Sequence, residues 1–197
     1  MLSHVTHFLT VLLLYALSRR ISGSHIASSK ATSIIAAALH IISPAGAFLS
    51  APYSESFFST LNFLGFYLYL DGRITGGYQG DIETIVAGVS FGCASVIRSN
   101  GILGGLPFLY DAVLQALHLL RNGLSPEEVR KLLALCTGGM LVALGAILPQ
   151  YEAYQRFCVD VIESDRRPWC EYTLPSIYGM VQQHYWFVQS LGLSEWC

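Results

Sequence analysis

The stretch from residue 132 to residue 148 reads LLALCTGGMLVALGAIL and contains no charged side chain. At about 1.5 Å rise per residue, a helix of this length approaches the roughly 30 Å thickness of a bilayer's hydrocarbon core. The composition also favours a lipid environment, because 53% of the 197 residues are hydrophobic and only 12% are charged. Soluble proteins carry about twice that charged fraction. The stretch therefore predicts a membrane-spanning helix.

The charge balance argues against a nucleic-acid-binding protein. The 11 Lys and Arg residues are nearly balanced by 13 Asp and Glu residues, which gives a net charge of −2. Nucleic-acid-binding domains usually show a basic patch or stripe, and the sequence has no Lys/Arg-rich run of that kind. A membrane protein is the leading class.

Further apolar segments, separated by short polar stretches, lie before residue 132. The complete set of apolar ranges is 5–17, 31–49, 57–70, 85–97, 102–120 and 132–148. This alternation is typical of multispanning proteins. We therefore predict an all-α fold: residues 1–150 form a multispanning membrane helix bundle with short loops and about six spanning or partly spanning helices. Residues 151–197 are predicted to form a lumenal, aromatic-rich tail with RPWC and HYW motifs.

The first segment, residues 5–17, is short for a membrane span. As a helix it rises roughly 20 Å, against a core of about 30 Å. We interpret it as a segment whose beginning is missing. A signal peptide is the alternative, but MLSH lacks the basic start of such peptides, and Arg19 and Arg20 follow the apolar run instead.

Lys and Arg are distributed unevenly between the two sets of loops. One set holds Arg19, Arg20, Lys30, Arg73, Arg121, Arg130 and Lys131, and the other holds Arg98, Arg156, Arg166 and Arg167. The positive-inside rule places the first set in the cytosol. The C-terminal tail and the loop at Arg98 are then expected on the lumenal side of a eukaryotic membrane.

Cysteine positions suggest a disulfide and no metal site. Cys158 and Cys170 fall in the predicted lumenal tail, where an oxidising compartment permits a disulfide that contributes about 3 kcal/mol. Cys93 and Cys136 lie in apolar segments and are interpreted as core residues, and Cys197 is unassigned. No pair has the spacing of a zinc site, so we predict no structural metal.

Trp and Tyr are concentrated in residues 167–186, RPWCEYTLPSIYGMVQQHYW. These side chains settle at the membrane boundary because they combine an apolar ring with a polar tip. Aromatic faces also stack on sugars, and Arg forms paired hydrogen bonds to phosphate. The second interpretation is therefore a site for a lipid-linked sugar phosphate. Its residues would be Arg166, Arg167, His184, Tyr185 and Trp186.

Two polar clusters interrupt the apolar pattern. Glu55 lies in APYSES (residues 51–56), and Arg98 and Asn100 lie in IRSNG (residues 97–101). A charge at membrane depth costs several kcal/mol and usually lines a cavity. If the chain reverses at Arg98 to Asn100, both clusters and the tail reach one lumenal surface. A substrate role and a structural ion pair between Glu55 and Arg98 both remain open.

Other polar positions are interpreted as structural. His40, four residues before Pro44, is expected to be buried and hydrogen-bonded beside a helix kink. Asp111 and His118 are expected to be interfacial or to face the bundle. GGYQGD, residues 76–81, is expected to be a glycine-rich loop, but it lacks the preceding strand and the Lys-Ser/Thr ending of a phosphate loop.

Four tracts, taken in order, resemble a known family. They are SPAGAFLSAPYSESFFSTLNFLGF (43–66), ASVIRSNGILGG (94–105), YQRFC (154–158) and RPWCEYTLPSIYGMVQQHYW (167–186). From about residue 5 to residue 186 the chain resembles the GPI mannosyltransferase 2 family, membrane enzymes that add the second mannose to the glycosylphosphatidylinositol (GPI) precursor. The last tract is the most specific of the four.

The resemblance implies a multi-pass endoplasmic-reticulum mannosyltransferase of the GT-C class. Its donor would be dolichol-phosphate mannose, its acceptor the GPI-precursor glycolipid, and its product an α-1,6-linked mannose formed with inversion on the lumenal face. No cofactor is firmly implied, and a divalent ion and a membrane partner subunit stay open. The positions that match family motifs, taken as candidate substrate-binding residues, are Glu55, Arg98, Asn100, Arg167, Trp169, His184, Tyr185 and Trp186.

The chain departs from the family pattern at both ends. Family members carry an earlier lumenal loop with a Trp-Asp motif, whose Asp is the presumed catalytic carboxylate, and we find no counterpart here. We therefore expect a partial chain without transferase activity by itself and assign no catalytic residue. The alternatives are a non-catalytic membrane subunit and a lipid or solute transporter. Transporters usually show matching halves, and residues 5–97 do not resemble residues 102–197.

Overall fold

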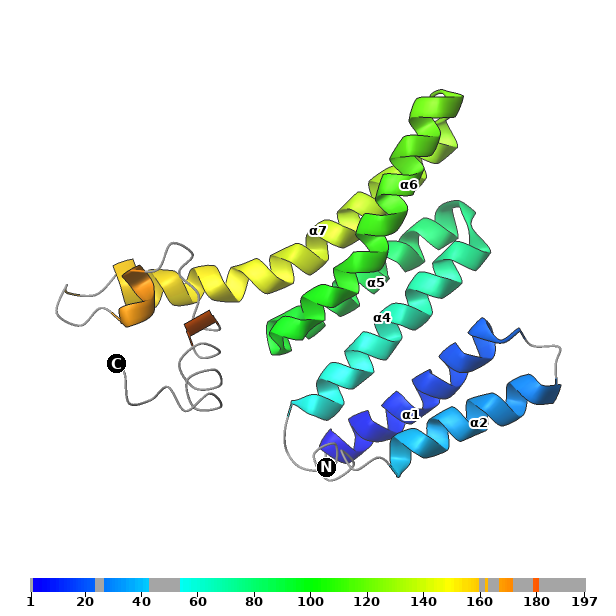
Figure 1. Cartoon of the computed structure of the whole chain (residues 1–197), viewed down its shortest axis with the longest axis horizontal. Helices are drawn as coiled ribbons and strands as arrows, with labels where there is room; N and C mark the ends of the chain where they lie inside the picture. Colours follow the sequence, from blue (N-terminus) through cyan, green and yellow to red (C-terminus); the bar gives the residue numbers. More distant parts are fainter. Residues whose placement is uncertain are drawn as a thin grey trace, which may run out of the picture. The chain divides into compact units, whose positions relative to one another are not determined.

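A computed structural model of the chain describes residues 2–23, 27–42, 54–159, 162, 167–171 and 179–180. Within these ranges the chain is helical and contains no strand. The main helices are α1 (Leu2–Ile21), α2 (Ala27–Ile41), α4 (Glu55–Thr75), α5 (Gly77–Ile97), α6 (Leu106–Asn122) and α7 (Pro126–Tyr154) (Figure 1). The predicted all-α fold class is confirmed.

Each predicted apolar segment overlaps one of these helices. In the described part of the chain, three helical stretches are long and apolar enough to cross a membrane: Gly77–Ile97, Ser99–Asn122 and Pro126–Val159. The middle stretch combines α6 with a preceding 3-10 helix, Ser99–Gly105. Lys30–Ile41, within α2, is a shorter apolar helix. The part of the predicted second segment from residue 43 onward lies outside the described residues.

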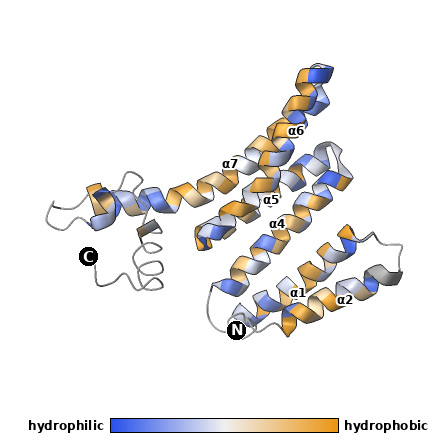
Figure 2. Ribbon diagram, viewed as in Figure 1, coloured by the Kyte–Doolittle hydropathy of each residue, from blue (hydrophilic) through white to orange (hydrophobic). Residues whose placement is uncertain are grey.

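The surface of the bundle is apolar, as expected of a protein surrounded by lipid. Leu109 of α6 and Leu133 and Met140 of α7 are each more than 60% exposed. Figure 2 shows hydrophobic residues on the outer sides of several helices. Exposed apolar patches of this extent are rare on soluble monomers. The chain is therefore a membrane helix bundle.

The predicted glycine-rich loop at residues 76–81 is wrong. Helix α4 continues through Arg73 to Thr75, and α5 begins at Gly77, so Gly76 alone joins the two helices. Gly76 and Gly77 have φ angles of 63° and 60°, in the left-handed region that glycine adopts without a steric penalty. Residues 77–81 form the first turn of α5, which makes α4 and α5 an antiparallel hairpin.

Small residues bring α5 and α7 into close contact. A Cβ atom placed on Gly88 of α5 would lie 2.5 Å from the Cα atom of Gly138 in α7. One placed on Gly145 would lie 2.1 Å from the carbonyl oxygen of Gly92. Membrane helices associate through such small-residue faces because lipid provides no hydrophobic driving force between them. The glycines therefore determine how closely the helices approach.

Aromatic rings form the core between the helices. Phe91 of α5 and Phe108 of α6 are fully buried, with ring centroids 6.2 Å apart in an edge-to-face arrangement. Tyr69 of α4 packs on Phe108 at 4.7 Å. Edge-to-face packing directs the positive ring edge toward a negative ring face. The core thus ties α4, α5 and α6 together.

The chain divides into two units, Met1–Gly145 and Ala146–Cys197. In the second unit, Cys158 and Cys170 form the disulfide considered from the sequence. The expectation that Cys93 and Cys136 are core residues is wrong, because both thiols are exposed in the structure. The lumenal position of the tail stays a prediction.

Candidate functional site

Glu55 and Arg98 form an ion pair, although 43 residues separate them in sequence. Nη1 of Arg98 donates to Oε1 of Glu55 at 2.7 Å. Glu55 is the first residue of α4 and Arg98 follows the last residue of α5. Because the two helices run antiparallel, the start of one lies beside the end of the other. The hairpin itself therefore creates the pair.

The pair keeps unused bonding capacity. Oε2 of Glu55 is buried and has no hydrogen-bond partner among the described residues. The side chains of Glu55 and Arg98 are 33% and 40% exposed, so parts of both are accessible although Oε2 itself is buried. The guanidinium of Arg98 bonds Glu55 through one nitrogen and lies 5.7 Å from the ring centroid of Phe58. Within the described residues, the other N–H groups of Arg98 have no hydrogen-bond partner.

Asn100 lies two residues after Arg98, exposed in the 3-10 helix Ser99–Gly105. The chain reverses tightly here: a Cβ atom on Gly101 would lie 2.4 Å from the backbone nitrogen of Ser95. The turn considered at Arg98 to Asn100 is therefore present. Glu55, Arg98 and Asn100 therefore come from one end of the α4–α5 hairpin.

A row of hydroxyl groups positions the first turns of α4. Thr6 of α1 donates to the hydroxyl of Ser56 at 3.0 Å, and the hydroxyls of Thr10 and Thr60 are 2.8 Å apart. Thr6, Thr10 and Ser56 are all at most 5% exposed. Because Ser56 follows Glu55 directly, this row orients the start of α4 and hence Glu55. Sequence reasoning missed it, although Ser3, Thr6 and Thr10 follow one another at spacings of three and four residues in α1.

The aromatic tail is only partly described. Trp169 lies in the 3-10 helix Pro168–Glu171 and is 4% exposed, beside the disulfide of Cys170. Arg167 is exposed. The remaining tail candidates, Arg166, His184, Tyr185 and Trp186, lie outside the described residues. Whether the tail meets Glu55 and Arg98 stays a prediction.

Histidine 40 differs from its expected state. Its Nε2 is buried and has no hydrogen-bond partner among the described residues, so the expected hydrogen bond is not seen at this nitrogen. Instead, the ring stacks on His7 with centroids 5.4 Å apart and meets the edge of Phe63. Pro44 lies outside the described residues. The ring contact joins α1 and α2.

Asp111 faces the bundle, one of the two environments expected for it. It is 8% exposed and accepts hydrogen bonds from Tyr69 and Arg73 of α4. His118 remains exposed and lies 2.7 Å from the side-chain nitrogen of Asn122. In the described part of the chain, no cluster of three or more His, Cys, Asp or Glu residues could hold a metal ion.

Comparison with known proteins identifies the family. Residues 1–194 match the family described as Mannosyltransferase (PIG-V). The chain belongs to this family. The resemblance seen in the sequence is thereby confirmed, and the membrane bundle described above is that of a mannosyltransferase family. No solved structure matches the chain.

Curated relatives support the same assignment. The chain is 46% identical over 191 residues to GPI mannosyltransferase 2 of Aspergillus oryzae, which covers 95% of this chain and 44% of the relative. It is 48% identical over 183 residues to GPI mannosyltransferase 2 of Aspergillus fumigatus, covering 91% of this chain and 41% of the relative. The chain therefore spans less than half the length of these relatives.

Proposed function

We propose that the chain takes part in transferring mannose from dolichol-phosphate mannose to the GPI-precursor glycolipid in the endoplasmic-reticulum membrane. The product would carry the second mannose in α-1,6 linkage. The family assignment and the name shared by the relatives support the reaction class. The ion pair of Glu55 and Arg98, with its unused oxygen, is the observation that supports a substrate site in this chain.

The two side chains suit the two substrates. The carboxylate of Glu55, which is 33% exposed, can accept a hydrogen bond from the sugar hydroxyl that attacks the mannose carbon. The unused N–H groups of Arg98 can bind the phosphate that departs with the dolichol. Asn100, exposed beside them, adds an amide that can bond either substrate. We also propose substrate binding for the candidate residues of the tail, which are Arg167, Trp169, His184, Tyr185 and Trp186.

The setting of the reaction is also part of the proposal. Both substrates are lipids, so each must reach the site from within the membrane that holds the bundle. We propose no organic cofactor, and a requirement for a divalent ion is left to measurement. A membrane partner subunit is compatible with the exposed apolar helix faces.

A graft of the chain tests the proposal. This chain would replace its matching segment in the Aspergillus oryzae relative, in a fungal strain that lacks the second GPI mannosyltransferase. We expect lipid-linked precursors with two mannoses to accumulate with the graft and precursors with one mannose without it. Glu55→Gln and Arg98→Gln should each lower the two-mannose product at least tenfold, about 1.4 kcal/mol in barrier height.

The matched control removes a different ion pair. Glu152 and Arg156 form a pair at 3.7 Å, and their side chains are 67% and 76% exposed. Glu152→Gln and Arg156→Gln should leave both the protein level and the product unchanged. Undiminished product from Glu55→Gln at normal protein level would contradict the proposed substrate site.

A further inference from the structure

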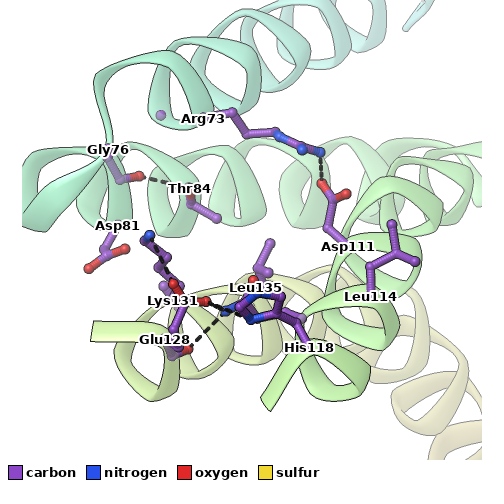
Figure 3. A pocket seen from close by; sticks show the side chains of 14 residues that line it. Arg73, Gly76, Asp81, Thr84, Asp111, Leu114, His118, Glu128, Lys131 and Leu135 are labelled. Atoms are coloured by element: carbon purple, nitrogen blue, oxygen red, sulfur yellow. Dashed lines mark hydrogen bonds and ion pairs between the residues drawn. The ribbon is translucent and has the colours of Figure 1, made fainter. Parts of the chain in front are cut away.

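A second polar site lies at the other end of α4. Glu55 is in the first turn of this helix and Arg73 in the last, which at about 1.5 Å per residue separates them by roughly 27 Å. Arg73 lines a pocket of about 470 Å³, and neither Glu55 nor Arg98 belongs to its lining. Figure 3 shows side chains of α4 to α7 around this space.

Polar links between helices hold the pocket open. Each link joins two different helices, and the linked residues are Arg73 with Asp111, Arg130 with Asp81, and Gln115 with Glu128. Together they connect α4 to α6, α5 to α7, and α6 to α7. Because these links fix the helices around the pocket, the site is already formed without a ligand. Less conformational entropy is then lost when a ligand binds.

Two cations of the lining keep donors available. The side chain of Arg73 is 56% exposed and bonds Asp111 through Nη1, so its other guanidinium N–H groups have no partner in the described part of the chain. Lys131 is 37% exposed and pairs with Glu127 at 3.2 Å and Glu128 at 3.6 Å on its own helix. Arg and Lys with spare donors are the residues that hold phosphate groups.

The same lining carries carboxylates and an apolar wall. Asp81 and Glu128 retain acceptor capacity, since each carboxylate offers about four lone-pair positions. Leu114, Ala134 and Leu135 form the apolar wall of the lining. Residues of the pocket lie at the end of α4, at the start of α5 and in the first turns of α7, where the apolar segments meet polar residues. Lipid headgroups are expected at such helix ends.

We propose that this pocket binds the headgroup of a membrane phospholipid that carries both a phosphate and a primary ammonium group. The phosphate lies between Arg73 and Lys131, and the ammonium donates to Glu128 and Asp81. A purely anionic headgroup leaves those carboxylates facing like charge. A quaternary ammonium headgroup has no N–H to donate. The wall at Leu114 favours a lipid over a soluble molecule with the same polar groups.

Native mass spectrometry of the full chain tests this assignment. The chain, purified in detergent and stripped of lipid, is titrated with phosphatidylethanolamine, phosphatidylcholine or phosphatidylglycerol of identical acyl chains. We expect phosphatidylethanolamine to bind about tenfold more tightly than either other lipid, about 1.4 kcal/mol. Equal binding of the three lipids would overturn the proposal. Soluble glycerophosphoethanolamine should compete only weakly with the lipid. If it competed as strongly as phosphatidylethanolamine does, the proposal that the ligand is a membrane lipid would be wrong.

Two variants with matched controls locate the binding. Leu114→Trp fills the pocket from a position that is 47% exposed, while Leu117→Trp is its control, because Leu117 is 45% exposed on the same helix and lies outside the lining. Lys131→Gln removes a cation, and Lys30→Gln, at an exposed position in α2, is its control. We expect Leu114→Trp and Lys131→Gln each to weaken phosphatidylethanolamine binding at least fivefold. The two control variants should bind this lipid as the unchanged chain does. Equal effects in variants and controls would rule out this pocket.

Discussion

The hydroxyls of Thr10 in α1 and Thr60 in α4 lie 2.8 Å apart inside the bundle. Thr10 is completely buried, and it also donates to the backbone oxygen of Thr6. The single hydrogen of the Thr60 hydroxyl can go to Thr10 or to the backbone oxygen of Thr6, which lies 2.8 Å away, so the contact belongs to a row that includes Ser56. α1 is therefore fastened to the end of α4 that carries Glu55.

Replacing Thr10 with Val should loosen this attachment. The change keeps the shape but removes a buried hydroxyl, and hydrogen bonds between membrane helices contribute about 0.6 kcal/mol on average and up to about 1.7. We expect a lower melting temperature in detergent, with partial recovery in Thr10→Ser. Thr137→Val is the control, because that exposed hydroxyl bonds only within α7. Equal melting of the Thr10 and Thr137 variants would show that the row is energetically unimportant.

Exchanging the charges of Glu55 and Arg98 separates the two interpretations of their pair. In the graft described above, the double variant Glu55→Arg with Arg98→Glu keeps an ion pair but reverses its direction. If the residues bind substrate, the protein level should recover relative to the single variants while mannose transfer stays at least tenfold low. Quantitative immunoblotting and precursor analysis measure the two quantities. Recovery of both would instead identify a structural pair.

A methyl group at Gly88 should separate α5 from α7. The added Cβ would lie 2.5 Å from a backbone atom of Gly138, which side-chain rotation cannot relieve. Overpacking of this kind costs about 1–3 kcal/mol, so Gly88→Ala should reduce folded protein in membranes. At Gly139 the nearest contact is an ordinary 3.5 Å, and Gly139→Ala should be tolerated. If both variants gave a normal amount of folded protein, the close contact between α5 and α7 at Gly88 would be contradicted.

Alkylation of thiols should reveal the disulfide of Cys158 and Cys170. Maleimide labelling of denatured, unreduced protein should leave two cysteines unlabelled, and reduction should add two labels because the pair opens. In the Cys170→Ser variant, reduction should add no further maleimide labels. The loss of a closed loop of this size lowers stability by about 3 kcal/mol. Identical labelling with and without reductant would show that the thiols are free.

Cysteine accessibility tests whether the tail shares a side with Glu55. Single cysteines at Ser54 and Tyr172, in a background without other free cysteines, should react with an impermeant maleimide from the same side of sealed membranes. The prediction follows from the distribution of Lys and Arg between loops. Labelling from opposite sides would separate the aromatic tail from Glu55 and Arg98, and no common substrate pocket could then exist.

Hydropathy predicted the helices well because membrane burial selects apolar composition over a whole span. Residues 85–97 and 132–148 became parts of α5 and α7, and the turn at Arg98 followed from its polar side chains. The ends of helices were predicted less accurately. Helix α4 continues past Asp71 to Thr75, because Asp71 pairs with Arg20 of α1 and Arg73 pairs with Asp111 of α6. Local composition does not reveal such distant partners.

The sequence by itself determined the membrane class, the helical fold and the family, because these depend on composition and on motifs that lie together in the chain. Only the tertiary structure decided which polar residues meet. The antiparallel hairpin of α4 and α5 joins Glu55 to Arg98, and the four helix ends enclose the pocket at Arg73 and Lys131. Contacts of this kind depend on how helices pack, and packing is set by small residues such as Gly88 and Gly138 far from either site.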